Sequence, residues 1–377
     1  MSKSFCKLLY KYITTTDFIK KSYFLGIVYY KKNLKDSSSE IRIFGLPFWK
    51  KKFRRGKERF YLLGLLYWRR SSKKKLYNTI LEYVEPKYSN IYINFNCSGE
   101  TYLFLSYIKP SKDSIFIATK KYHKDLCRMM HPEIDCIYLP DIVYLRSLDN
   151  NNIYKEEYKG KTFYNILPFN YFVRFEDNLR KGKEVHYCEE ICKTIGIEYT
   201  KEAKKPIISE ETKQNTLMKV KRIGLNLDNF VFLCPESQSN ENPKDSFWID
   251  LTDTLYSKGY DIFINTISLK PEYGTGKTCF LTFDEAYYLA SLSKKIIGLR
   301  SGFIEMLTSN NVPIICYYTD FKNRGLLKSI NAERVLKGFS LKKLPNVKPD
   351  NIFEFDIKNY TKGEQLDGKS FCYNAGV

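Results

Sequence analysis

The sequence predicts an α/β protein with two Rossmann-like domains, and three observations support this fold class. At 377 residues the chain is long for a single hydrophobic core, and 43% of its residues are apolar, as in a globular protein. Strand-like and helix-like segments alternate from residue 88 to residue 139. A similar alternation runs from residue 230 to residue 318. Such alternation is typical of parallel sheets with right-handed crossovers.

In the first half, short apolar runs predict the strands and longer apolar runs predict the helices. The expected strands are 91–95, 114–118 and 136–139, and the expected helices are 101–108 and 122–130. Residues 150–161 are polar and indicate a loop or a solvent-exposed crossover, whereas 186–196 fits a helix that Gly196 closes. The charged stretch 201–216 contains Pro206 and has no sustained apolar period, so we assign it as the interdomain linker.

In the second half, the stretch from Lys294 to Tyr318 carries the strongest prediction. An apolar run ends at Gly298, a turn passes through Arg300, and a helix is expected from Phe303 to Ser309 before another strand. Earlier in this half, Phe230–Cys234 is expected to be a buried strand. A turn at the carboxyl end of a parallel strand offers backbone N–H groups and a helix start to an anion. With the added charge of Arg300, the stretch predicts a site for a nucleotide diphosphate.

The chain is strongly basic, and the charge is concentrated near its N-terminus. The net charge is +20, and the segment from Lys50 to Lys75 contains twelve Lys or Arg and one Glu, interleaved with aromatic and aliphatic residues. This pattern favours a peripheral contact with an anionic membrane surface. A solvated basic linker explains it almost as well. Nucleic-acid binding ranks last because no recognition motif accompanies the charge, so no nucleic acid is expected as a partner.

Other sequence signals concern the compartment and metals. No run is long enough to span a bilayer, and the N-terminus lacks the apolar core of a signal peptide, so we expect a cytoplasmic protein. Ten cysteines without CxxC pairs and three histidines give no metal-binding spacing. We therefore expect reduced thiols, no metal ligands and no bound cofactor.

Several motifs in the order above resemble the bacterial lipopolysaccharide heptosyltransferase family. The run from residue 91 to residue 140 has Gly99 and Glu100 where that family has Gly-Asp, and His131, Pro132 and Asp135 match its later turn into a strand. The resemblance covers roughly residues 88–320. It implies the GT-B arrangement, in which two Rossmann-like domains face each other across a cleft.

The resemblance also implies roles for individual residues. Where the family has Asp-Ser/Thr-Gly followed by His, this chain has Arg300, Ser301, Gly302 and Glu305, which makes ADP-heptose a doubtful donor. An arginine that faces the pyrophosphate is also a theme of fucosyltransferases that use GDP-fucose. Glu100 is the candidate catalytic base, although its plain structural role would be a carboxylate at a helix start. The remaining expectations are a donor site of Arg300, Ser301, Gly302, Glu305, Lys244 and Ser237, and an acceptor-side loop of Ser98 and Gly99.

Together these signals predict a metal-independent glycosyltransferase, and the resemblance alone implies that it inverts the configuration of the sugar. It would move a sugar from a nucleotide-diphosphate sugar to a lipid-linked or cell-surface glycan, of lipopolysaccharide or capsule type, at the inner face of a bacterial membrane. The alternatives are a fucosyltransferase-like enzyme that uses GDP-fucose and a non-catalytic basic protein that binds glycan, lipid or nucleic acid. The expected domains are a basic aromatic segment (1–85), an acceptor domain (86–205), a nucleotide-sugar domain (217–335) and a tail that packs back on the acceptor domain (336–377).

Overall fold

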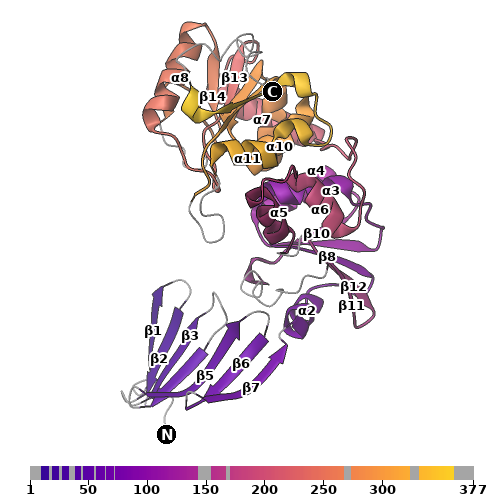
Figure 1. Cartoon of the computed structure of the whole chain (residues 1–377), viewed down its shortest axis with the longest axis vertical. Helices are drawn as coiled ribbons and strands as arrows, with labels where there is room; N and C mark the ends of the chain where they lie inside the picture. The colour runs from indigo at the N-terminus through magenta and orange to yellow at the C-terminus, as the bar shows by residue number, and fades with distance from the viewer. Residues whose placement is uncertain are drawn as a thin grey trace. The chain divides into compact units, whose positions relative to one another are not determined.

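The computed structural model of the chain contains three β-sheets, two of which have helices between their strands (Figure 1). It describes residues 10–16, 19–24, 28–33, 39–43, 46–54, 57–63, 65–71, 73–142, 154–166, 170–266, 273–322 and 331–360. The chain divides into two compact units. The first holds the seven-stranded sheet and the β8–β12 sheet, and the second holds the β13–β17 sheet together with helices α3 and α4.

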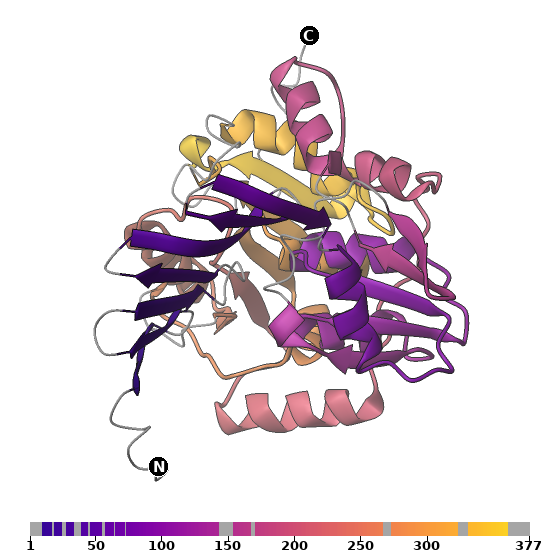
Figure 2. The same ribbon diagram turned by 90° about the horizontal axis from the view of Figure 1, so that it is seen from below.

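The first sheet is an antiparallel meander in which each strand pairs with the next, so that its seven strands lie side by side (Figure 2). Its strands are β1 (Tyr10–Thr16), β2 (Ile19–Phe24), β3 (Val28–Asn33), β4 (Ser39–Ile43), β5 (Leu46–Arg54), β6 (Lys57–Leu62) and β7 (Leu65–Ser71). Most of the basic segment Lys50–Lys75 therefore lies in strands β5, β6 and β7, which were not predicted.

The second sheet has the order β10-β9-β8-β12-β11. Its strands are β8 (Asn90–Asn94), β9 (Ser114–Ala118), β10 (Asp135–Tyr138), β11 (Lys155–Tyr158) and β12 (Lys161–Asn165). Strands β8 and β9 are parallel, as predicted, and β12, which was not predicted, is parallel to β8. Apolar side chains of these three strands share a buried core with helix α2 (Lys73–Leu81). The segment 150–161 was predicted to be a loop or a solvent-exposed crossover. Residues 150–153 lie outside the described residues, and the loop is wrong for Lys155–Tyr158, which form β11. Lys159 and Gly160 have positive φ and form a tight turn between the antiparallel strands β11 and β12.

The third sheet is fully parallel, in the order β14-β13-β15-β16-β17. Its strands are β13 (Phe230–Cys234), β14 (Asp261–Ile264), β15 (Lys295–Leu299), β16 (Ile314–Tyr318) and β17 (Ile352–Asp356). Strands β13 and β16 are buried along their whole length, which explains their unbroken apolar sequences. The α/β class predicted from the sequence is thus confirmed, whereas the facing of two domains across a cleft stays a prediction.

The helices carry the connections. They are α3 (Ser98–Tyr107), α4 (Lys121–Met130), α5 (Asn170–Arg180), α6 (Tyr187–Ile195), α7 (Glu210–Arg222), α8 (Asp245–Ser257), α9 (Phe283–Leu292), α10 (Gly302–Leu307) and α11 (Ala332–Phe339). Short 3-10 helices are η3 (Thr308–Asn310), η5 (Leu341–Lys343), η6 (Pro349–Asn351) and η7 (Ile357–Asn359). The predicted helices at 101–108, 122–130, 186–196 and 303–309 correspond to α3, α4, α6 and α10 with η3.

One assignment needs correction, and the tail adds a strand to the C-terminal sheet. The predicted linker at 201–216 becomes helix α7 from Glu210 onward. Ser209 caps that helix by accepting from the Thr212 N–H, and acidic residues in its first turn and basic residues in its last suit the helix dipole, so it forms without a broad apolar stripe. The weakly patterned tail supplies β17, which pairs with β16 in the C-terminal sheet. The other domain limits stay predictions.

Candidate functional site

The strand order of the C-terminal sheet marks one edge as a place for a ligand. In chain order its strands run 2-1-3-4-5, so the direction of winding reverses between β13 and β15. In open parallel sheets the crevice outside the carboxyl ends of the strands at such a reversal is the usual ligand site. Ser237 follows the end of β13, and Arg300, Ser301 and Gly302 follow the end of β15. The predicted donor residues are therefore concentrated at this reversal.

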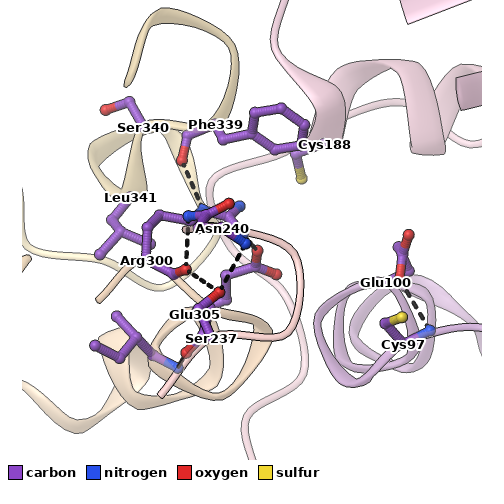
Figure 3. Close-up of polar contacts among 12 residues, drawn as sticks. Cys97, Glu100, Cys188, Ser237, Asn240, Arg300, Glu305, Phe339, Ser340 and Leu341 are labelled. Carbon is purple, nitrogen blue, oxygen red and sulfur yellow. Dashed lines mark hydrogen bonds and ion pairs between the residues drawn. The ribbon is translucent and has the colours of Figure 1, made fainter. Parts of the chain in front are cut away.

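Hydrogen bonds fasten the two loops to each other (Figure 3). The Ser237 hydroxyl donates to the main-chain carbonyl of Arg300 at 3.1 Å, and the Asn240 amide donates to the same oxygen at 3.0 Å. A third loop joins them, because the Lys322 ammonium donates to the Ser237 carbonyl at 2.7 Å. Ser237 and Asn240 are buried, so they position the turn at Arg300.

The Arg300 side chain turns inward and forms an ion pair with Glu305 (Figure 3). The Arg300 side chain is 10% exposed and the Glu305 side chain 2%. The guanidinium also donates from Nε to the Phe339 carbonyl at 3.4 Å, and its carbon lies 4.9 Å from the centre of the Phe339 ring and 5.2 Å from that of Tyr187. Helix α10 is thereby held to α6 and to the end of α11.

This buried pair is electrostatically demanding. Burial raises the pKa of the Glu305 carboxyl, and the Arg300 guanidinium opposes that shift. Burial and the Glu305 carboxylate both raise the pKa of the Tyr187 phenol. Within the described residues, Arg300 Nη2, Glu305 Oε2 and the Tyr187 hydroxyl have no hydrogen-bond partner. The Tyr187 hydroxyl and the Glu305 carboxylate nevertheless lie close enough to interact with each other, so the unused capacity is clearest at Arg300 Nη2.

Two helix starts that are far apart in the sequence meet beside this pair. Side chains would not fit there: a Cβ on Gly302 would collide with the Gly99 nitrogen and lie 2.7 Å from Ser98 Oγ, and a Cβ on Gly99 would collide with the Glu305 carboxylate. Glycine at both positions allows the backbones of α3 and α10 to touch. The predicted acceptor-side loop and the predicted donor-side turn are thus in direct contact.

Glu100 lies in the first turn of α3 and has a structural partner. Its Oε2 accepts from the Cys97 N–H at 3.0 Å, in a capping box (Figure 3). Ser301 plays a similar part for α10, where its hydroxyl accepts from the Ile304 N–H at 3.4 Å. Glu100 is half-buried. The geometry therefore gives Glu100 a helix-start role, and its role as a base stays a prediction.

Lys244 differs from the other predicted donor residues because it is exposed. It is the N-cap residue of α8 and makes no side-chain cap hydrogen bond. The structure thus brings Ser98, Gly99, Gly302 and Glu305 together at one contact. Sequence reasoning missed Asn240, Tyr187 and Phe339. The polar loop after β13 could have suggested Asn240, but no local pattern points to two aromatic rings that reach Arg300 from other helices.

His186 supports the same region from the start of α6. Its Nε2 lies 3.0 Å from the Ser340 carbonyl, and burial lowers its pKa to about 3, to which nearby Arg300 contributes. The folded protein therefore holds a neutral imidazole, whereas an unfolded chain protonates it below about pH 6.5.

This pKa shift predicts a pH dependence of stability. Above about pH 6.5 His186 is neutral in both states and costs no stability. As the pH falls from there toward 3, protonation of His186 in the unfolded chain lowers the free energy of unfolding by up to about 1.4 kcal/mol per pH unit. Between pH 6.5 and pH 5, the free energy of unfolding in urea should fall by roughly 2 kcal/mol more in the wild type than in His186→Gln, which cannot titrate. Equal slopes for the two proteins would show that His186 is not responsible.

The described residues also bear on metal binding and on membrane-spanning helices. There, no three His, Cys, Asp or Glu side chains are grouped so that they could hold a metal ion. Within the same residues, no helix has the length and apolar character needed to cross a bilayer. The eight described cysteines are free thiols.

Comparison with known proteins gives structural neighbours only. No protein-family model and no curated protein matches the sequence. Among solved structures, ADP-heptose LPS heptosyltransferase II of E. coli is 14% identical with a TM-score of 0.42, over 71% of this chain and 90% of that one. A glycosyl transferase of family 9 from Veillonella parvula is 13% identical with a TM-score of 0.40, over 72% and 87%. E. coli heptosyltransferase WaaC with ADP is 8% identical with a TM-score of 0.41, over 71% and 92%. Two of these three neighbours are named as heptosyltransferases.

Proposed function

We propose that this chain is a glycosyltransferase that takes a sugar from a nucleotide-diphosphate sugar and transfers it to a glycan acceptor. The observation that carries the proposal is the reversal of winding between β13 and β15, where Ser237 and the Arg300–Gly302 turn meet. A parallel sheet with this order binds nucleotides outside such a reversal. The order of motifs along the sequence supports the same reaction.

The proposed roles follow from the contacts. The diphosphate lies over the turn at Ser301 and Gly302, where Lys244 supplies a mobile positive charge that stabilises the leaving group. The Arg300–Glu305 pair lies beneath this turn and fixes it. Its Nη2 can donate a hydrogen bond to a bound nucleotide sugar, and its Oε2 can accept one. Glu100 removes the proton from the acceptor hydroxyl. No step uses a metal ion, and the sugar is transferred with inversion.

The acceptor proposed is a lipid-linked or cell-surface glycan, of the lipopolysaccharide or capsule type. Such an acceptor would require the enzyme to work at the cytoplasmic face of the membrane. The net charge of +20 supports this location, because anionic headgroups attract a basic protein.

A thermal-shift screen of the full chain tests the nucleotide site. ADP, GDP, UDP and CDP, each alone and as a sugar conjugate, are compared, because a ligand that binds only the folded state raises the Tm. One nucleotide family should raise the Tm. Lys244→Gln should lower the affinity of the protein for that nucleotide about fivefold, as expected for loss of a charge-assisted contact of about 1 kcal/mol.

The matched control is Lys221→Gln, which removes an exposed lysine from α7. This variant should bind the nucleotide as the wild type does. A response to GDP alone would favour the GDP-fucose alternative. A protein that responds to none of the nucleotides or conjugates is not a nucleotide-sugar transferase, and a non-catalytic basic binding protein would then be the better description.

A further inference from the structure

The N-terminal sheet is built from a sequence repeat. The segments FLGIVYYKK (24–32), IFGLPFWKK (43–51) and LLGLLYWRR (62–70) begin 19 residues apart, and each has an apolar pair, a glycine, an aliphatic residue and then two aromatic and two basic residues near its end. The pattern spans the hairpins β2–β3, β4–β5 and β6–β7. A fixed period of this kind indicates one structural unit used three times.

The strand register shows that the second and third repeats are structurally equivalent. The pairing of β4 with β5 skips one residue at Phe48, and the pairing of β6 with β7 skips one at Tyr67. Phe48 and Tyr67 occupy the same place in their repeats, 19 residues apart. Two β-bulges at matching positions show that the second and third hairpins share their irregularities as well as their sequence.

Successive connections of a meander lie at opposite ends of its strands. The turns of the hairpins β2–β3, β4–β5 and β6–β7 therefore all lie at the same end of the sheet. We name this end, where the strands meet the three hairpin turns, the apolar edge. Its paired strand ends are Phe24 and Val28, Ile43 and Leu46, and Leu62 and Leu65. At the opposite edge the strands end in Asn33, Ser39, Arg54 and Lys57. The apolar residues of all three repeats are therefore gathered at one edge.

Three side chains at the apolar edge are exposed to solvent. Leu63 is 69% exposed, Phe48 42% and Leu62 39%, and the Leu63 N–H donates to the Phe48 carbonyl at 2.9 Å, so the three lie close together. Leu63 has a φ of 50°, the left-handed conformation that a tight hairpin turn requires, although asparagine suits that conformation better than leucine. An exposed leucine at a position that favours a small polar residue points to an apolar partner.

From the apolar edge, aromatic residues and then cations follow along each repeat. Lys31 lies three residues after Val28, Lys50 four after Leu46, and Arg69 four after Leu65, which is about 10–13 Å along a strand. In a bilayer the acyl chains, the aromatic belt and the phosphates follow one another in the same order and over a similar depth.

We propose that the apolar edge inserts into an anionic lipid bilayer. The ends of the three hairpins enter the acyl boundary, the paired aromatic residues lie at the headgroups, and the repeated cations bind lipid phosphates. Lipid is favoured over nucleic acid because the residues at the edge are mainly aliphatic, which suits acyl chains, whereas single-stranded nucleic acid is held by stacking on aromatic rings. This surface belongs to the first compact unit, whereas the residues of the proposed nucleotide site belong to the second.

Vesicle co-flotation of the full chain tests the proposal. The probe is a vesicle of phosphatidylcholine and phosphatidylglycerol in equal amounts, compared with phosphatidylcholine alone. The wild type should bind the anionic vesicles. The double variant Leu63→Asn with Phe48→Thr should bind them about tenfold more weakly, because it removes two exposed apolar side chains while asparagine suits the turn and threonine suits a strand.

Phe280→Asn is the matched control, because Phe280 is 71% exposed in a loop of the other unit and its replacement should leave vesicle binding unchanged. Lys31→Gln, Lys50→Gln and Arg69→Gln, combined stepwise, should weaken binding by a similar factor at each step, because the repeats act alike. Wild-type failure to bind, equal binding by the double variant, or stronger competition by a single-stranded oligonucleotide would each overturn the proposal. Nucleotide response in the thermal-shift screen should be the same in all these variants, so the two proposals fail independently.

Discussion

Replacing Glu305 with alanine should lower the free energy of unfolding by about 3–5 kcal/mol, because the Arg300 guanidinium would stay buried without its counter-ion. The aromatic rings beside Arg300 cannot replace a carboxylate, and the Phe339 carbonyl already accepts one of its N–H groups. Urea unfolding followed by circular dichroism measures the loss.

A companion variant separates the cost of an unpaired charge from a loss of packing. Arg300→Met with Glu305→Leu removes both charges and keeps apolar volume, so it should recover most of the stability that Glu305→Ala loses. Glu333→Ala, which breaks the exposed pair of Glu333 with Lys337 on α11, is the matched control and should have far less effect. If Glu305→Ala were as stable as this control, the buried pair would not hold α10 in place.

Replacing Glu100 with glutamine should slow glycosyl transfer by about 10²–10⁴-fold, the range for losing a general base. The substitution is suited to the question because glutamine also completes a capping box. It should keep the hydrogen bond from the Cys97 N–H and leave the Tm unchanged. The measurement is release of nucleoside diphosphate from the donor in the presence of a lipid-linked glycan, with EDTA present because no metal is proposed.

Glu100→Ala completes this test. It loses both the carboxylate and the cap, so its Tm should fall while its activity matches that of Glu100→Gln. Nucleotide affinity should remain that of the wild type in both variants, since Glu100 acts on the acceptor. A glutamine variant that transfers at the wild-type rate would leave Glu100 with the helix-start role alone.

Local sequence patterns predicted the parallel sheets because buried strands such as β13 and β16 have unbroken apolar sequences. The same criterion failed where structure depends on something else. Helix α7 relies on its cap and end charges, and β11 depends on a turn at Lys159 and Gly160. Strand β17 has half-exposed residues and a mixed sequence, so only its pairing with β16 identifies it.

The site was predictable in its position but not in its contacts. Ser301 and Gly302, which follow β15, predict a turn at the end of the strand, and the structure has that turn. The sequence could not show that Arg300 and Glu305 would pair with each other, since both carry charge and either could have faced a ligand. Nor could it show that Gly99 and Gly302 would touch, because a contact between residues so far apart depends on how the helices pack.

Strand β17 also bears on how the protein is made. Until it is synthesised, one side of β16 is an open edge of apolar strand, the kind of edge to which other chains add. Ile352 lies 34 positions after Tyr318, so at about 5–20 residues per second the ribosome needs roughly 2–7 seconds to deliver the strand that covers it. During that interval the emerging chain depends on chaperones or on its own delay in folding to avoid pairing with its neighbours on the same messenger RNA.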